Sequence, residues 1–246
     1  MSATQRHDLQ GQMALVTGAT SGLGRAIALQ LARDGAEVIV HGRDAARGAQ
    51  TVETIAASGG RARFVAADLG DPADLQRLVT EAGDIDVLVN NAGFSVFGPT
   101  ADLDIARFDA LFASNVRAPF YLVAAFAPAM AARGTGSIIN IGSMSGSVGL
   151  ADGAAYGATK AALASLTRSW AAEYSPRGVR VNTVAAGPIY TRPEARELFD
   201  TLGATTALKR AADPAEIAEV VAFLASPRAS YVTGAIVAAD GGRTAI

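Results

Sequence analysis

Tyr156 and Lys160 have the residue types and the spacing of a general acid–base pair. They lie four residues apart in AAYGATKAAL, and residues i and i+4 share one face of a helix. A free phenol has a pKa of about 10, and a fixed ammonium group nearby lowers that pKa toward the range useful for catalysis at neutral pH. Of the 21 basic residues only Lys160 and Lys209 are lysines, which hints that the compact ammonium is needed here. The alternative is a chance pair on a structural helix.

Three more polar side chains are candidates for the same site. Ser143 ends an apolar run, in NIGSMSG, and its hydroxyl can donate to a substrate oxygen. Ser145 is the competing serine, and we prefer Ser143 because it sits at the strand end. Asn115 lies in the middle of a predicted helix, where asparagine is unfavourable, so we expect it to hold a water molecule or a main-chain carbonyl.

An alternation of apolar runs and helical patterns supplies the scaffold. The expected strands span residues 13–18, 36–43, 61–69, 85–93, 136–143, 179–187 and 234–242, and the expected helices span 25–35, 44–60, 71–83, 104–132, 154–175 and 214–226. This order predicts an α/β fold, a single doubly wound Rossmann domain over residues 1–246. Its seven-stranded parallel sheet would have helices on both faces. Residues 188–212 break the rhythm and are expected to be irregular and to line the ligand crevice.

The first strand-to-helix turn, TGATSGLG at 17–24, is typical of a phosphate-binding loop. Gly18, Gly22 and Gly24 let the backbone turn tightly, and the following helix points free N–H groups at the turn. A plain tight turn is the alternative. Its place at the first strand–helix junction of an α/β chain favours dinucleotide binding.

The end of the second strand predicts NADP(H) in preference to NAD(H). Gly42 takes the place of the acid that would accept from a ribose 2′-OH, and Arg43 follows, which suits a 2′-phosphate. Alternatively, Arg43 is an ordinary solvated side chain and Asp44 caps the next helix. Asp68 either accepts from the adenine amino group or caps a helix, and NNAG at 90–93 either holds loop backbone or is ordinary turn chemistry.

Composition narrows the function further. The chain has no cysteine, two histidines (His7 and His41) and a net charge of -2. We therefore expect no disulfide, no metal site and no nucleic-acid partner. The polar first residues lack a signal-peptide pattern, and no stretch is expected to reach the length of a membrane span. These observations predict a soluble cytoplasmic protein acting on small molecules.

Together these motifs resemble the short-chain dehydrogenase/reductase family. TGATSGLG, NNAG, YGATK and GPIYT, with Asn115 and Ser143, occur in family order across nearly the whole chain. The resemblance implies that Tyr156 is the acid/base, that Ser143 orients and polarises the substrate carbonyl, and that Lys160 lowers the Tyr156 pKa and binds the nicotinamide ribose. Asn115 would support a proton relay through water to Lys160. The expected cofactor contacts are Gly18, Thr20, Ser21, Gly22, Leu23, Gly24, Arg43, Asp68, Leu69, Asn91, Ala92, Gly93, Tyr156, Lys160, Gly187, Ile189 and Thr191.

The implied activity is the interconversion of a secondary alcohol and a ketone by hydride transfer. Alternatives are an NAD-dependent sugar-acid or polyol dehydrogenase, a 3-oxoacyl thioester reductase, and a dinucleotide sensor without turnover. Ala172 stands where carrier-protein reductases tend to have a basic residue, which argues against a carrier-protein partner. The family implies a homotetramer built partly from the helices near 104–132 and 154–174. Candidate pocket walls are Phe94, Val96, Leu150, Ile189 and Leu198.

Overall fold

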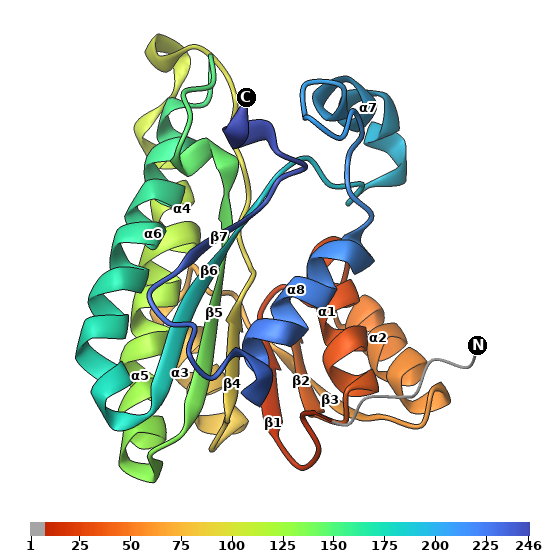
Figure 1. Ribbon diagram of the computed structural model, residues 1–246, viewed down its shortest axis with the longest axis vertical. Coiled ribbons are helices and arrows are strands. Elements are labelled where there is room, and N and C mark those ends of the chain that lie inside the picture. The colour runs from red at the N-terminus through yellow and green to blue at the C-terminus, as the bar shows by residue number, and fades with distance from the viewer. Residues whose placement is uncertain (1–7) are drawn as a thin grey trace.

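The apolar runs predicted as strands form one parallel sheet, whose inner strands are largely buried. The computed structural model describes residues 8–246, and its seven strands pair in the order β3-β2-β1-β4-β5-β6-β7 (Figure 1). They are β1 (Met13–Val16), β2 (Glu37–Gly42), β3 (Arg61–Ala66), β4 (Val87–Asn90), β5 (Gly136–Ser143), β6 (Val179–Ala186) and β7 (Ile236–Ala239). All six pairings are parallel. The predicted fold class is confirmed, and the first seven residues of the predicted range 1–246 lie outside the described residues.

Helices cover both faces because successive strand side chains point to opposite sides of the sheet. Val16 and Val40 pack into the core beneath α1 (Gly22–Arg33), α2 (Ala45–Ala57) and α8 (Pro214–Ala225). Leu15 and Ile39 pack into the opposite core, beneath α3 (Pro72–Ala82), α5 (Ala118–Arg133) and α6 (Ala154–Tyr174). Figure 1 shows the two layers on either side of the strands. Both faces are buried, which explains why the strands read as continuous apolar runs.

The strand order reverses direction between β1 and β4. β1 pairs with β2 on one side and with β4 on the other, so the connections leave the sheet in opposite directions from this point. In doubly wound sheets such a reversal opens a crevice at the carboxyl ends of the strands. The turn after β1 and the segment after β4 therefore face the same space.

The helix predicted over 104–132 is not one regular helix. It consists of α4 (Ile105–Phe112), a π-helical segment (Ala113–Arg117) and α5, which follow one another without a break. The π-helical segment contains Asn115, whose buried side chain is bonded outside the helix. A side chain engaged in this way accounts for the departure from α-helical spacing.

The joined run Ile105–Arg133 has the length predicted for one helix. Within the described part of the chain it is the one helix long and apolar enough to cross a membrane by length and composition, with a mean hydropathy of 1.3. The expectation that no stretch reaches the length of a membrane span was therefore wrong. However, Leu122, Phe126 and Met130 pack on the sheet, so the run serves as a core helix of this domain.

Residues 188–212 contain a helix that the sequence did not predict. A 3-10 turn at 193–195 leads into α7 (Arg196–Gly203), which is eight residues long. Leu198, Phe199 and Leu202 of this helix face a cavity at the carboxyl ends of the strands. The region does line the crevice, as expected, but it is partly helical.

Candidate active site

Ser143 and Tyr156 meet at the carboxyl end of β5. Ser143 is the last residue of that strand, and Tyr156 lies in the first turn of α6, the next long helix. Both line a cavity of about 630 Å³. Burial raises the pKa of the Tyr156 phenol, and a hydrogen bond with Ser143 lowers it by a smaller amount. The net direction is upward here, so the lowering attributed to Lys160 stays a prediction.

Lys160 is buried one helical turn after Tyr156. Its Nζ donates a hydrogen bond to the Ile141 carbonyl oxygen at 2.8 Å and lies 5.7 Å from the centre of the Tyr156 ring. Burial lowers the pKa of Lys160 to about 8, so the side chain is still mostly charged at pH 7. A main-chain carbonyl of β5 thus fixes a cation beside the phenol. The geometry is what an acid–base pair requires.

Ser143 and Ser145 form a small hydroxyl pair. The Ser143 Oγ accepts from the Ser145 backbone N–H at 3.2 Å, and the two hydroxyl oxygens lie 3.1 Å apart. Both serines line the cavity. The hydrogen bond that acts on the Tyr156 pKa comes from Ser143, which supports the preference for that residue.

Asn115 holds main chain behind the cavity. Its Nδ2 donates to the Phe94 carbonyl at 2.9 Å and to the Thr159 hydroxyl at 3.1 Å, while its Oδ1 accepts from the Phe94 N–H at 3.1 Å. Asn115 therefore holds the Phe94 main-chain carbonyl, which is one of the two roles expected for it. A Cβ added to Gly93 would lie 2.7 Å from Asn115 Oδ1, so only glycine fits there without a shift. The relay to Lys160 stays a prediction.

The turn after β1 has the features of a phosphate cradle. Gly18 and Gly22 have positive φ angles of 66° and 50°, which favour glycine. A Cβ on Gly24 would lie 2.2 Å from the Gly18 carbonyl oxygen, so α1 packs closely against the turn. Ser21, which precedes α1, makes no side-chain cap bond, and the first N–H groups of the helix are left for an anion.

NNAG ties the end of β4 to this turn. The Thr17 hydroxyl accepts from the N–H groups of Asn91 at 3.0 Å and Ala92 at 2.9 Å. Asn91 Nδ2 donates to the Thr17 carbonyl at 2.8 Å. Asn90 instead donates to Asn140 inside the sheet. The expected role in holding loop backbone is therefore carried by Asn91, and Thr17 is a partner that the sequence reasoning missed.

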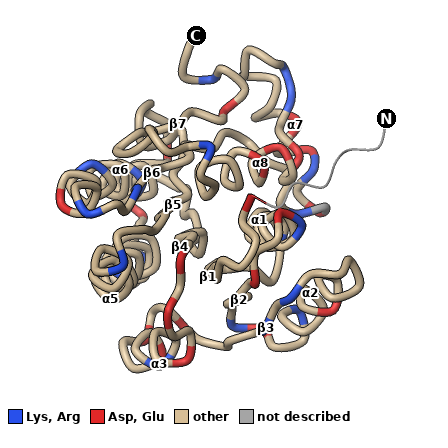
Figure 2. The backbone as a smooth tube through the Cα atoms, turned by 60° about the horizontal axis from the view of Figure 1, so that its bottom comes forward, with Lys and Arg blue, Asp and Glu red and all other residues tan. Residues whose placement is uncertain are grey.

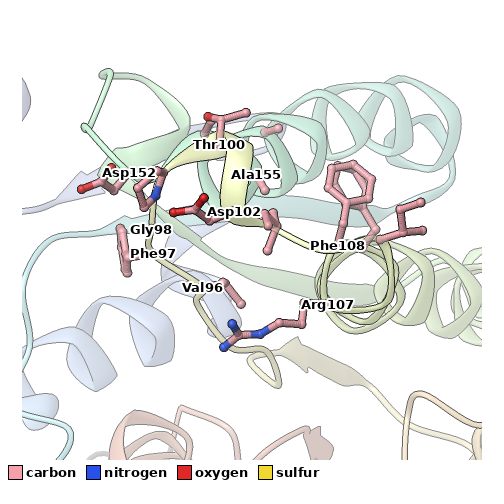
Figure 3. Close-up of a pocket in the computed structure, with 15 residues that line it drawn as sticks. Val96, Phe97, Gly98, Thr100, Asp102, Arg107, Phe108, Asp152 and Ala155 are labelled. Carbon is pink, nitrogen blue, oxygen red and sulfur yellow. The ribbon is translucent and has the colours of Figure 1, made fainter.

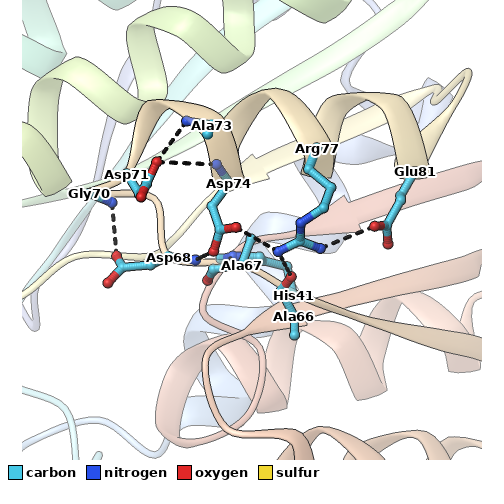
Figure 4. A network of polar contacts seen from close by, with 10 residues as sticks. All are labelled: His41, Ala66, Ala67, Asp68, Gly70, Asp71, Ala73, Asp74, Arg77 and Glu81. Carbon is cyan, nitrogen blue, oxygen red and sulfur yellow. Dashed lines mark hydrogen bonds and ion pairs between the residues drawn. The ribbon is translucent and has the colours of Figure 1, made fainter.

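His41 is a second residue that the sequence reasoning missed. Its Nδ1 accepts from the Gly18 N–H at 3.2 Å, and its Nε2 donates to the Ala67 carbonyl at 3.1 Å. Burial lowers its pKa to about 4, so the ring is neutral with the proton on Nε2. The available signal was a histidine inside the apolar run of β2. Figure 4 shows His41 beside the polar cluster that follows β3.

The ends of β2 and β3 line a second cavity, of about 720 Å³. Arg43 lies on it with its side chain 78% exposed and a nitrogen 3.9 Å from an Asp68 carboxylate oxygen. Asp68 accepts from the Gly70 N–H, as Figure 4 shows, and the cap of α3 is Asp71. The helix-cap interpretation of Asp68 is therefore wrong, whereas Asp44 does cap α2.

The two cavities adjoin, because Asn91, Gly93 and Phe94 line both. Together they fit an elongated ligand such as a dinucleotide. All of the predicted cofactor contacts except Gly22 and Gly24 line one cavity or the other. The predicted catalytic residue Asn115 also lies outside both linings. The larger cavity is lined by Gly18, Thr20, Ser21, Arg43, Asp68, Leu69 and Ala92, and the catalytic one by Leu23, Ser143, Tyr156, Lys160, Gly187, Ile189 and Thr191. Within residues 8–246 no group of three or more histidine or acidic side chains is placed to hold a metal ion.

The predicted apolar walls are mostly in place. Phe94, Leu150, Ile189 and Leu198 line the catalytic cavity. Val96 was expected there too, but it lines a neighbouring cavity of about 670 Å³ (Figure 3).

Comparisons with known proteins agree with this geometry. A family model described as enoyl-(acyl carrier protein) reductase matches residues 18–244. Galactitol 2-dehydrogenase (L-tagatose-forming) of Cereibacter sphaeroides is 40% identical over 246 residues, covering 96% of each chain. A solved short chain dehydrogenase/reductase family protein is 50% identical with a TM-score of 0.92, covering 97% of this chain and 100% of that one. The angucycline C-6 ketoreductase LanV with bound NADP is 37% identical with a TM-score of 0.89, covering 98% of each.

Proposed function

We propose that this chain interconverts a secondary alcohol and a ketone, with NADP(H) in preference to NAD(H). The chain belongs to the short-chain dehydrogenase/reductase family and is an oxidoreductase acting on CH–OH groups. The observation that carries the proposal is one cavity in which Ser143, Tyr156 and Lys160 meet. The neighbouring cavity beside Val96 and the larger cavity beside Gly18 contain none of these three side chains.

A nicotinamide dinucleotide, when bound, supplies the hydride donor for reduction or the hydride acceptor for oxidation. The phosphate turn around Gly18 would hold its pyrophosphate, and Asp68 its adenine end. Lys160 would hold the nicotinamide ribose, and Ile189 and Thr191 the nicotinamide end. The turn around Gly18 and Asp68 line the larger cavity, and Lys160, Ile189 and Thr191 line the catalytic cavity.

The protein's own groups move the proton. In the reduction, the Tyr156 phenol donates its proton to the substrate oxygen while the Ser143 hydroxyl donates a hydrogen bond to it. The raised pKa keeps the phenol protonated at neutral pH, as an acid must be. In the oxidation, the phenolate would take the proton from the alcohol, and the charge of Lys160 would stabilise that phenolate.

Preference for NADP(H) rests on the end of β2. A Cβ on Gly42 would lie 2.5 Å from Thr20 Cγ2, so the acidic side chain that would select a 2′-OH has no room there unless Thr20 moves. Arg43 is exposed on the cavity wall, where a guanidinium suits a phosphate. The bound NADP of the angucycline ketoreductase supports the same choice.

Two other substrate classes are alternatives to a ketone. The galactitol 2-dehydrogenase relative favours a polyol, a structural neighbour described as a putative gluconate 5-dehydrogenase favours a sugar acid, and the family-model description favours an acyl thioester. We rank a polyol or sugar acid below a compact ketone, because the cavity is lined by apolar side chains such as Phe94 and Leu198. We rank an acyl thioester below it because Ala172 lacks the positive charge that would suit a carrier-protein partner. A sensor without turnover is weaker still, since it has no need of the Tyr156–Lys160 pair.

The proposed assembly is a homotetramer in the cytoplasm, where diffusible NADP(H) is available. Phe120 and Tyr121 of α5 are 44% and 55% exposed, and the Phe120 ring is tilted against the Trp170 ring of α6, with their centres 6.2 Å apart. An aromatic face of this kind is suited to association. Light scattering after gel filtration tests the assembly, and a monomer would contradict it; cell fractionation tests the location.

The first experiment follows nicotinamide absorbance with NADPH and with NADH against ketones, diketones, keto acids, sugar acids, polyols and acyl thioesters. We expect turnover of a ketone, with a higher kcat/KM for NADPH. Turnover of polyols or thioesters alone would replace the proposed substrate class. Cofactor binding without turnover on any compound would support the sensor.

A further inference from the structure

Among residues 8–246, Phe97 is the one that lines both the catalytic cavity and the neighbouring cavity of about 670 Å³. We infer that Phe97 is a specificity-determining residue, which closes the catalytic cavity on the Tyr156 side and excludes ketones with a bulky apolar group there. This inference rests on the proposed function, because it concerns the substrate of that same site.

Phe97 is held from three sides. The Gly98 N–H donates to the Asp152 carbonyl at 2.9 Å, which ties the loop to the turn before α6. A Cβ added to Gly153 would lie 3.2 Å from Phe97 Cε1, so the ring packs where only a glycine leaves room. The ring is also tilted against the Tyr156 ring, with their centres 5.7 Å apart. Phe97 is 56% exposed, but its ring packs on Tyr156 and Gly153 and so forms a wall beside the acid/base.

The neighbouring cavity is roomy and mainly apolar, although Asp102, Arg107 and Asp152 also lie on its lining. One wall is the first part of α6, where Ala154, Ala155 and Ala158 present only methyl groups. The other wall comes from the loop after β4 and from α4, including Val96 and Phe108 (Figure 3). Figure 3 labels Ala155 and Phe108 among the residues that line this space. An apolar substituent that passed Phe97 would thus enter an apolar surrounding.

The Phe97 ring separates the two cavities and so limits the size of the substrate. Ala155 faces the neighbouring cavity, and Tyr156, the next residue, faces the catalytic cavity. A ketone bound with its oxygen at Tyr156 therefore has one substituent directed toward Phe97. With the ring in place this substituent must be compact, and without it the substituent can extend into the neighbouring cavity.

The test is the kcat/KM ratio of bulky to compact methyl ketones, using 2-butanone, 4-phenyl-2-butanone and 4-(2-naphthyl)-2-butanone with NADPH. We expect Phe97→Ala to raise this ratio about tenfold or more, since even one methylene in an apolar pocket changes selectivity by that order. Phe97→Leu should raise it less and serves if the alanine variant does not fold. Thermal denaturation checks folding.

Two further variants locate the space that is gained. Phe108→Ala changes the neighbouring cavity without touching Phe97, so the ratio should stay at the wild-type value. Phe97→Ala combined with Ala158→Phe refills the neighbouring cavity, so the ratio should return toward wild type. A gain that survives this refilling would contradict the inference.

The failures are distinguishable. If the wild-type protein reduces 2-butanone but neither Phe97 variant changes the ratio by more than about twofold, the inference fails and the proposed function stands. If the wild-type protein reduces no ketone, the proposed function fails and takes the inference with it.

Discussion

The floor and the rim of the catalytic cavity are built in different ways. The floor consists of Ser143, Tyr156 and Lys160, whose positions are fixed by the end of β5 and by α6. The rim consists of Phe94, Phe97 and Leu198, which are 43%, 56% and 52% exposed. Floor groups are polar, and Ser143 and Lys160 are hydrogen-bonded to main chain, whereas rim groups are apolar and offer contact area. The difference indicates that buried floor residues fix the catalytic chemistry. The exposed rim residues set the substrate selectivity, and they can change at little cost in stability.

The largest expected effect would break the floor itself. Tyr156→Phe removes the phenolic proton and keeps the ring, so catalysis should fall by a factor of roughly 10² to 10⁴. Cofactor binding, measured by NADPH fluorescence, should change by less than about twofold, because the ring still packs on Phe97. Retention of most of the activity would remove Tyr156 from the proton-transfer role.

The second effect concerns His41, which accepts a hydrogen bond from the Gly18 N–H in the turn proposed to bind the cofactor. Its pKa is about 4 in the folded protein against an ordinary value of 6.5, so between these pH values the unfolded chain binds a proton that the folded protein does not. Stability is therefore present above pH 6.5 and lost as the pH falls toward 4, by up to about 3 kcal/mol.

Denaturant unfolding of the wild-type protein and of His41→Asn across this pH range isolates the contribution of the histidine. The free-energy advantage of the wild-type protein should shrink as the pH falls. A constant difference between the two proteins would show that His41 titrates normally.

The third effect tests the cofactor end of the cleft. Arg43→Ala should raise the KM for NADPH about tenfold, which corresponds to the loss of one charge-assisted hydrogen bond, and should leave the KM for NADH nearly unchanged. Arg47→Ala is the matched control, because Arg47 lines the same cavity but is paired with Asp44 at 2.9 Å. Equal losses with both cofactors would exclude the 2′-phosphate role of Arg43.

The smallest effect sharpens the contrast between rim and core. Leu198→Ala should change the free energy of unfolding by less than about 0.5 kcal/mol, since half of the side chain is exposed, while raising the substrate KM a few-fold. Leu163→Ala, in the buried face of α6, should cost about 2–5 kcal/mol. Similar losses of stability in the two variants would mean that the rim is part of the core.

The sequence was informative wherever local chemistry and element ends coincide. Ser143, Tyr156 and Lys160 could be predicted to meet, because a strand end and the following helix place them at the same edge of the sheet. The sheet followed from continuous apolar runs, and the phosphate turn from its glycines at the first strand–helix junction.

What the sequence could not supply depends on distant partners. The bonds of His41 to Gly18 and Ala67 join three segments, and no local pattern shows them. α7 escaped prediction because it is short and follows a proline-containing turn. Val96 was assigned to the wrong cavity, because the direction of a side chain in an irregular loop cannot be read from spacing.

The π-helical segment Ala113–Arg117 has a consequence for how the protein can vary. A π turn adds a residue to the helical repeat and so shifts the phase of everything that follows. α5 turns Leu122 and Phe126 to the sheet, while α4 leaves Ile105 and Phe108 partly exposed. The direction in which α4 presents its side chains is thus offset from that of α5 by the π-helical segment. Deleting one residue from 113–117 would restore a uniform repeat and turn α4 by about 100° relative to α5, giving it a different face without any change in its own composition.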